Sequence, residues 1–205
     1  METKILKPTK ENLQRAGEMI RAGEPVAFPT ETVYGLGADG LNVAACKKIF
    51  VVKGRPADKP LSLHVANLET VEKLVKKISP AAEKLFKKFC PGPLTIILEK
   101  SEIVPDFVTG GKKNVGIRFP DNEIALALIK ISGCPVAAPS ANISGMSPPK
   151  NAEEVLKNFS GKIPVILDGG ECKFGISSTV VDLSGDVPKI LRAGAITEDE
   201  IKNCL

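Results

Sequence analysis

The sequence predicts an α/β fold built on a mixed parallel and antiparallel sheet, and three observations support this. Short apolar runs typical of buried strands alternate with segments whose apolar residues recur three and four positions apart, as on one face of a helix. In the last third, strands follow short turns such as Ser184-Gly185-Asp186, which favours antiparallel neighbours. The 205 residues, 43% hydrophobic, contain no repeat or long linker, so we expect one domain over residues 1–205.

Eight short apolar runs are the predicted strands. In chain order they are Val26–Phe28, Leu61–Val65, Leu94–Leu98, Val115–Phe119, Pro135–Ala138, Val165–Leu167, Thr179–Leu183 and Lys189–Leu191.

Seven segments with helical periodicity are the predicted helices. They are Glu11–Arg21, Asn42–Val52, Leu68–Ile78, Pro80–Phe89, Glu123–Ile131, Ala152–Phe159 and Glu198–Cys204. Ser79 is expected to cap a helix that starts at Pro80, and Asn151 and Thr197 each precede a Glu by three positions, as in a capping box.

Composition limits the possible partners. The net charge of +4 favours anions such as phosphates without forming a basic tail, and five widely spaced cysteines with no C-x-x-C pair predict reduced packing residues. A single histidine excludes a His-rich metal site. The N-terminus lacks the pattern of a signal peptide and no apolar run is long enough to span a membrane, so we expect a cytoplasmic protein with no membrane partner.

The segment Pro29–Gly37 places two hydroxyls, a carboxylate and the single tyrosine in a predicted loop. Its glycines are expected to let the backbone approach a ligand closely. Gly35–Gly40 matches G-x-G-x-x-G, but a dinucleotide fold needs that turn directly after a strand, and Pro29–Tyr34 intervene. We therefore predict a polar ligand loop rather than a dinucleotide site.

Three cations, Lys53, Arg55 and Lys59, lie between a predicted helix and the next strand. Arginine suits bidentate contacts with phosphate or carboxylate, and lysine supplies a mobile point charge. The structural alternative is that cations complement the dipole at the end of the helix. For Lys53 the two interpretations have equal weight, whereas for all three cations together a ligand site is favoured.

A strand in the segment Val136–Gly145 runs directly into Ser140 and Asn142, as expected where ligands bind beyond strand ends in α/β sheets. Ser140 lacks the flanking glycines of a G-x-S-x-G elbow, so we expect it to form a hydrogen bond with a ligand and not to act as a nucleophile. A purely local turn remains the alternative for either residue.

Further polar residues lie in or beside predicted strands. Arg118 must face solvent, an acid or an anionic ligand, because an unpaired buried charge is costly. Ser178 precedes one strand and Arg192 closes another. The recurrence of hydroxyls and cations at strand ends predicts one shared site for a polyanion.

Taken in order, these segments resemble the YrdC-like family of threonylcarbamoyl-AMP synthases. The motifs are Pro29–Gly37, Lys53-x-Arg55-Pro56, Pro91-Gly92-Pro93-Leu94-Thr95, Arg118-Phe119-Pro120, Pro139–Gly145, Ser178–Asp182 and Leu191-Arg192-x-Gly194. Each motif is weak alone, whereas their order along nearly the whole chain is highly specific.

The resemblance implies a nucleotidyltransferase that joins L-threonine, bicarbonate and ATP into L-threonylcarbamoyladenylate and pyrophosphate. The product would pass to a threonylcarbamoyl transferase complex that modifies tRNA. The resemblance also implies a twisted sheet with flanking helices and a large concave cavity. The implied threonine contacts are Thr32, His64, Arg118, Ala138 and Ser178, and the implied ATP contacts are Lys53, Arg55, Lys59, Asn114, Ser140, Asn142 and Arg192.

No covalent catalytic residue is expected, because carbamate formation and adenylation need alignment and charge neutralisation. Mg²⁺ is expected on ATP, keeping most of its waters, so no protein metal site is predicted. The turn Met146–Pro149 departs from the order of residues in relatives, and no ligand contact is transferred to it. Since the sequence ends soon after Arg192, we expect no closure of the site by the C-terminal domain of longer members.

Two alternatives stay open. One is an RNA-binding module without catalysis, with tRNA or double-stranded RNA as partner; lysine pairs such as Lys76-Lys77 would suit it, but no aromatic stacking platform accompanies them. The other is a related carbamoyl-transfer domain, although no acylphosphatase-like or zinc-finger segment is present. The sequence assigns no role to Glu31 or Tyr34 and no oligomeric state.

Overall fold

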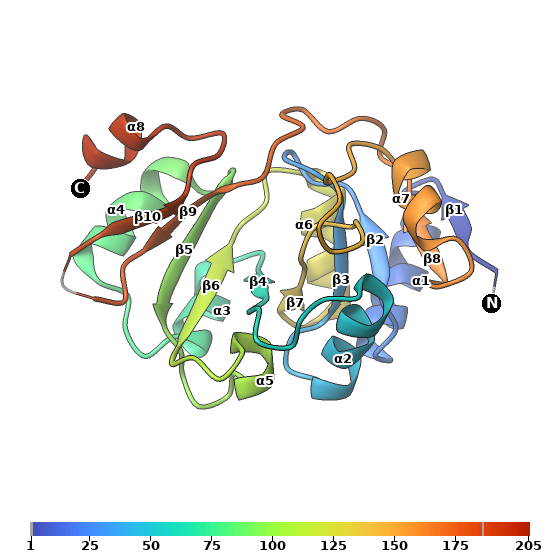
Figure 1. Ribbon diagram of the computed structural model, residues 1–205, viewed down its shortest axis with the longest axis horizontal. Coiled ribbons are helices and arrows are strands. Elements are labelled where there is room, and N and C mark those ends of the chain that lie inside the picture. The colour runs from blue at the N-terminus through green and yellow to red at the C-terminus, as the bar shows by residue number, and fades with distance from the viewer. Residues whose placement is uncertain (1, 186) are drawn as a thin grey trace.

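Ten strands join one mixed sheet in the computed structural model, which describes residues 2–185 and 187–205 (Figure 1). The strands are β1 (Lys4–Leu6), β2 (Val26–Phe28), β3 (Gly35–Asp39), β4 (Ser62–His64), β5 (Leu94–Glu99), β6 (Asn114–Arg118), β7 (Val136–Ala137), β8 (Val165–Leu167), β9 (Thr179–Asp182) and β10 (Lys189–Arg192). Their order across the sheet is β1-β8-β2-β3-β7-β4-β6-β5-β9-β10. Figure 1 shows β1 and β10 at opposite ends of the molecule and the strand direction turning between them, so the sheet is twisted.

Seven of the eight described helices begin after a residue whose side chain caps the first turn. The helices are α1 (Lys10–Arg21), α2 (Val43–Lys53), α3 (Leu68–Leu74), α4 (Pro80–Phe89), α5 (Asp106–Thr109), α6 (Glu123–Ser132), α7 (Ala152–Phe159) and α8 (Glu198–Lys202). Helix α5, which follows Pro105, has no side-chain cap. Ser79 caps α4, and Thr197 forms a complete capping box with Glu200. Asn151 caps α7, but Glu154 accepts the N–H of Lys150 instead of closing the predicted box.

The pairing of strands is mixed, as predicted. β1 and β2 both run parallel to β8, and β4 and β5 run parallel to β6 and β9 respectively, while the other pairs are antiparallel. The expectation that the last third contributes antiparallel neighbours holds only for β9 and β10. It is wrong for β8, which pairs in parallel with β1 and β2, and for the pairing of β9 with β5, which is also parallel. These partners come from earlier parts of the chain and not from neighbouring segments.

The main error of prediction concerns Gly35–Asp39, which was expected to lie in a loop but forms β3 between β2 and β7. A Cβ at Gly37 would lie 2.7 Å from both Phe28 and Val136, so packing against side chains, and not approach to a ligand, requires that glycine. The predicted helix Leu68–Ile78 ends early, at Leu74, because Val75 forms a β-bridge. Strand β1 and helix α5 were not predicted.

Two core clusters lie on opposite faces of the sheet. In β2, Val26 and Phe28 belong to the cluster with α1 and α6, whereas Ala27 belongs to the cluster that includes α2, α3, α4 and α7. Val136 and Ala137 of β7 divide in the same way. Successive strand residues point to opposite faces, which explains the alternation.

Helices α1 and α6 cover only half of the sheet face on which they pack. The sheet residues in their cluster come from β8, β2 and β7, which together with β3 we call the covered half. The strands β4, β6, β5 and β9 form the open half. By register with Val136, the open half presents on the same face Ser62, His64, Gly116, Arg118, Thr95 and Val180. Most of these residues are polar, so the open half is where a ligand site is expected.

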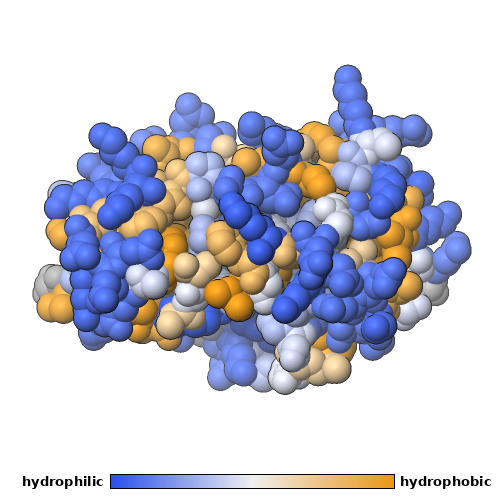
Figure 2. All heavy atoms as spheres, turned by 90° about the horizontal axis from the view of Figure 1, so that it is seen from above, coloured by the Kyte–Doolittle hydropathy of each residue, from blue (hydrophilic) through white to orange (hydrophobic). Residues whose placement is uncertain are grey.

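The surface agrees with the composition. Figure 2 shows one face as mostly hydrophilic, with hydrophobic atoms in small separate patches. All five cysteines are free. Among the described helices, none is long and apolar enough to cross a membrane.

Candidate functional site

A pocket of about 190 Å³ lies on the open half of the sheet. It contains seven of the twelve predicted site residues, which are Arg55, His64, Arg118, Ala138, Ser140, Ser178 and Arg192. They come from five strands or the segments beside them and from the end of α2. The fold therefore brings these seven residues to one pocket, whereas the other five do not line it.

Arg118 forms a buried ion pair at the base of this pocket. Its Nη2 lies 3.0 Å from Oε1 of Glu31 and donates to Oγ1 of Thr32 at 2.6 Å. Thr32 is in turn held by the hydroxyl of Thr30 at 2.9 Å. Of the three surroundings predicted for Arg118, the structure shows an acid. Thr32, a predicted threonine contact, bonds to Arg118 and does not itself line the pocket.

Arg192 also lines the pocket and is held there by a chain of hydroxyls. Its Nε donates to the backbone oxygen of Ser178 at 2.9 Å, and its Nη2 donates to the hydroxyl at 3.0 Å. That hydroxyl is 2.9 Å from the hydroxyl of Thr95. Burial lowers the pKa of Arg192 and the nearby charge of Arg118 adds to this, so an anion between the two arginines would be stabilised.

His64 is a neutral group in the pocket. Burial lowers its pKa well below the ordinary value, and Arg118, its register partner on β6, acts in the same direction. Its Nδ1 has no hydrogen-bond partner in the protein. The ring packs edge-on against Phe28 at 6.3 Å between centroids, which holds the imidazole at the border of the covered half.

The cationic segment divides into three different surroundings. Arg55 lines the pocket and also donates from Nε to the backbone oxygen of Lys59 and from Nη2 to that of Pro60. The side chain of Lys59 is exposed and does not line the pocket. The structure therefore brings Arg55 to the pocket but not Lys59, whose backbone oxygen only accepts a hydrogen bond from Arg55.

Lys53 points into the protein. It is 1% exposed, and its Nζ donates to the backbone oxygens of Ser140 and Asn142. Burial lowers the pKa of Lys53 to about 7. Because α2 ends at Lys53 and Gly54 adopts a left-handed φ of 58°, Lys53 and Arg55 leave the chain in different directions.

The two remaining predicted ATP contacts lie at the margins of the pocket. The side chain of Asn142 accepts from Ser140 and donates to the carbonyls of Ile143 and Met146, so it shapes the loop. Asn114 lines an adjoining hollow of about 170 Å³ and donates to Ser184 at 2.7 Å. Both hollows are lined by Ser62 and Thr95, which makes them neighbours along the sheet.

Sequence reasoning missed three polar residues of this region. Glu31 pairs with Arg118, Thr95 supports Ser178, and Ser62, the register partner of Gly116, lines the pocket. Tyr34, also unassigned, donates to Gly170 at 2.9 Å and so fixes a turn away from the pocket. For Thr95 and Ser62 the signal was a polar residue alternating with apolar ones; for Glu31 no local signal exists.

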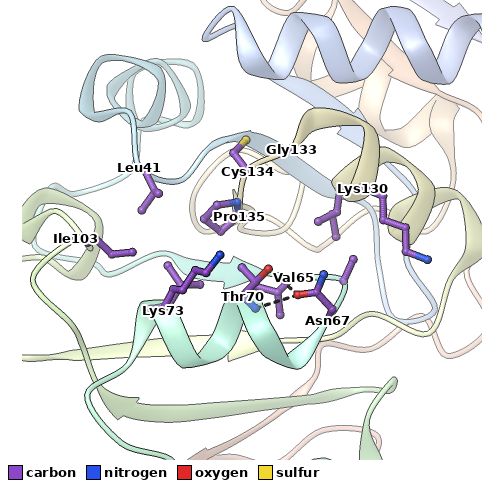
Figure 3. Close-up of a pocket in the computed structure, with 13 residues that line it drawn as sticks. Leu41, Val65, Asn67, Thr70, Lys73, Ile103, Lys130, Gly133, Cys134 and Pro135 are labelled. Atoms are coloured by element: carbon purple, nitrogen blue, oxygen red, sulfur yellow. Dashed lines mark hydrogen bonds between the residues drawn. The ribbon is translucent and has the colours of Figure 1, made fainter.

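A second hollow, of about 320 Å³, is larger but differs in chemistry. Figure 3 shows it between α3 and the segment Gly133–Pro135, with Asn67 and Thr70 bonded to each other on one side. None of the predicted site residues lines it. Its lysines are exposed and its wall is largely apolar, so the site is identified by its polar groups and not by its volume.

The fold and the pocket define a class: a mixed α/β protein that presents arginines and hydroxyls, groups suited to phosphates and carboxylates, on an open sheet face. Residues 18–194 match the family model for Sua5, YciO and YrdC proteins, which is described as "Telomere recombination". The chain belongs to this family.

Similar proteins support the assignment. The chain is 53% identical to the threonylcarbamoyl-AMP synthase of Pyrococcus abyssi and 47% identical to that of Bacillus subtilis, over 93% of its own length in each case. The structure of P. abyssi Sua5 complexed with L-threonine superimposes with a TM-score of 0.94 at 49% identity, covering 100% of this chain and 59% of that one. The chain spans 56% and 55% of the two curated relatives.

Proposed function

We propose that this chain joins L-threonine, bicarbonate and ATP into L-threonylcarbamoyladenylate and pyrophosphate. The observation that carries the proposal is the convergence of Arg55, Arg118 and Arg192 with hydroxyl groups in one pocket of a chain whose relatives are named threonylcarbamoyl-AMP synthases. A relative of this fold was crystallised with L-threonine. The product would serve threonylcarbamoylation of tRNA by a separate transferase.

The two sides of the pocket divide the substrates in this proposal. Arg118 and Ser178 would hold the amino acid, with Thr32 acting through Arg118, while Ala138 leaves room beside them. Arg55, Ser140 and Arg192 would neutralise the phosphates, and Asn114 in the adjoining hollow would contact the nucleoside. Lys53 would act from beneath, by holding the loop that carries Ser140 and Asn142.

The chemistry needs positioning and charge neutralisation. The threonine amine, once deprotonated, attacks the carbon derived from bicarbonate and water leaves, which gives a carbamate. A carbamate oxygen then attacks the α-phosphorus, and pyrophosphate departs with the electron pair of the broken P–O bond. Arginines and hydroxyls placed along the phosphates stabilise the charge that develops in this step.

Mg²⁺ enters the proposal as part of the substrate MgATP. The pocket offers cations and hydroxyls to the phosphates. In residues 2–185 and 187–205, no group of three or more His, Cys, Asp and Glu side chains is placed to hold a metal. The ion would therefore be carried by phosphate oxygens and water.

The direct test is mass detection of threonylcarbamoyladenylate after incubation of the protein with MgATP, L-threonine and bicarbonate. Pyrophosphate release should depend on threonine and bicarbonate together, and omission of either should abolish it. Binding of tRNA or double-stranded RNA without this release would replace the proposal with an RNA-binding module. Transfer of a carbamoyl group to another acceptor would place the chain among related carbamoyl-transfer domains.

A further inference from the structure

Glu31 is a carboxylate in the part of the protein where anions are expected to bind, and it carries no assigned role. It is 3% exposed and its Oε1 contacts Nη2 of Arg118 at 3.0 Å. Among the ion pairs of the described residues, Arg118 takes part in one, whereas Arg55 and Arg192 take part in none. Of the three arginines that line the pocket, only Arg118 is paired with a carboxylate, that of Glu31, among the described residues.

Unpartnered polar atoms concentrate in the same cluster. In the described residues, four buried side-chain nitrogen or oxygen atoms have no hydrogen-bond partner, and three of them are Oε2 of Glu31, Nε of Arg118 and Nδ1 of His64. Buried polar atoms are normally paired, and an unpaired one in a native structure calls for an explanation such as a catalytic role or a bound water or ion. The cluster thus has hydrogen-bonding capacity that the protein itself does not use.

Stability alone does not explain the buried ion pair between Glu31 and Arg118. A buried pair gains little over well-packed apolar residues, since both groups lose their hydration. Here two oxygens, from Glu31 and Thr32, hold the same nitrogen of Arg118. A guanidinium held at one nitrogen is fixed in orientation, and its other N–H groups remain for a ligand.

The backbone of Glu31 also ties this cluster to the wall of the pocket. Its carbonyl accepts from the N–H of Phe174 at 2.9 Å, within the segment that leads to Ser177 and Ser178. Both of these serines line the pocket. Glu31 therefore links the strand that carries Arg118 to the loop that faces it.

We infer that Glu31 is a positioning residue: by orienting Arg118 for the carboxylate of the amino-acid substrate, it sets the affinity for that substrate without touching it. This inference rests on the proposed function, because it takes the amino acid as the ligand of Arg118. It predicts an effect that is confined to the amino acid and absent for ATP.

The test compares Glu31→Gln, which keeps volume but removes the charge, with the matched control Glu99→Gln. Glu99 also pairs with a cation, Lys76, at 2.7 Å, but lies outside the pocket. Calorimetry without ATP should show an increase of about tenfold in the Kd for L-threonine for E31Q and none for E99Q, since a hydrogen bond between charged groups is lost. In turnover, KM for threonine should rise by the same factor, with kcat and KM for ATP nearly unchanged.

Two further variants test the route of the effect. Glu31→Asp, which keeps the charge, should restore part of the affinity. In an Arg118→Met background, E31Q should cause no further loss, because Glu31 acts through Arg118. Should E31Q not fold, Thr32→Val, which removes the other acceptor of the same nitrogen, is expected to raise the Kd for threonine in the same way without affecting ATP.

Several results would overturn the inference: wild-type affinity in E31Q, an equal loss in the R118M background, a parallel change in KM for ATP, or no binding of L-threonine by the wild type. A wild type that binds threonine but forms no adenylate would refute the proposed function only. In that case the calorimetric comparison would still decide the role of Glu31.

Discussion

The covered and open halves belong to one face of one sheet, yet they present opposite kinds of side chain. In the covered half, Phe28, Val136 and Leu167 meet helices α1 and α6. In the open half, His64 and Arg118 occupy positions in register with Val136 but line a pocket. The helices decide the difference: strand positions under a helix are apolar, and positions beyond the helices become available for binding.

The first prediction concerns the covered half, where the largest change in stability is expected. Leu167→Ala removes a side chain that is 0% exposed in the cluster with α1 and α6, and should lower the free energy of unfolding by about 2–5 kcal/mol. Urea unfolding measures this loss. The folded variant should keep its turnover number, and a fall in turnover at full folding would mean that the halves are not separable.

The second prediction concerns Arg55 in the open half. Arg55→Ala should reduce kcat/KM for adenylate formation by about 10²–10³-fold, since a cation facing the phosphates is lost. The loss of its bonds to two carbonyls should reduce stability by only about 1 kcal/mol. Arg21→Ala is the matched control, because Arg21 also donates to two carbonyls but lies on α1. Equal losses of activity in both variants would contradict the division.

The third prediction concerns Gly116, which lies on β6 where the pocket meets the adjoining hollow that Asn114 lines. A Cβ at Gly116 would lie 2.9 Å from Oγ of Ser62 and 3.1 Å from Cγ2 of Thr95. Gly116→Ala should therefore raise KM for ATP by about tenfold, as expected when one methyl group intrudes on a binding surface. Adding Ser62→Ala should restore part of the affinity by removing the closer clash. An unchanged KM in G116A would show that the nucleotide does not cross this part of the sheet.

The fourth prediction concerns the pH dependence of stability that Lys53 causes. Its pKa is about 7 in the folded protein against 10.5 ordinarily, so the unfolded chain binds more protons between these values and stability should rise with pH across this window. The carbonyls that accept from Nζ oppose the shift, so the slope should stay below about 1.4 kcal/mol per pH unit. Urea unfolding of Lys53→Met at pH 7 to 10 should lack this slope. A slope equal to that of the wild type would contradict the assignment.

Much of the fold was predictable because short strands and capped helices leave local signals. All eight predicted strands and seven predicted helices are present, four of them with the predicted ends and the others with shifted ends. Strand β3 was missed because Gly35 and Gly37 suggest a loop, although Leu36 and Ala38 between and after them keep the period of two. The glycines are required by Phe28, a contact that only the pairing of β2 with β3 creates.

For the candidate site, seven of the twelve predicted residues line one pocket, but the direction in which each side chain points was not predictable. The resemblance supplied seven residues that the pocket brings together, and the rule on buried charges gave an acid as one of three surroundings for Arg118. Which acid would supply it was not readable, since Glu31 lies 87 positions away. Contacts of this kind depend on sheet register, which no local pattern specifies.

The end of α2 has a consequence for how mutational data on such sites are interpreted. Lys53 and Arg55 flank Gly54 but support the site in different ways. Lys53 holds the Ser140–Asn142 loop from the protein interior, whereas Arg55 faces the pocket. Replacing either should strongly reduce the reaction, so loss of activity alone does not distinguish a ligand contact from a scaffold. Only the accompanying change in loop order or in protection of the loop amides from hydrogen exchange separates the two.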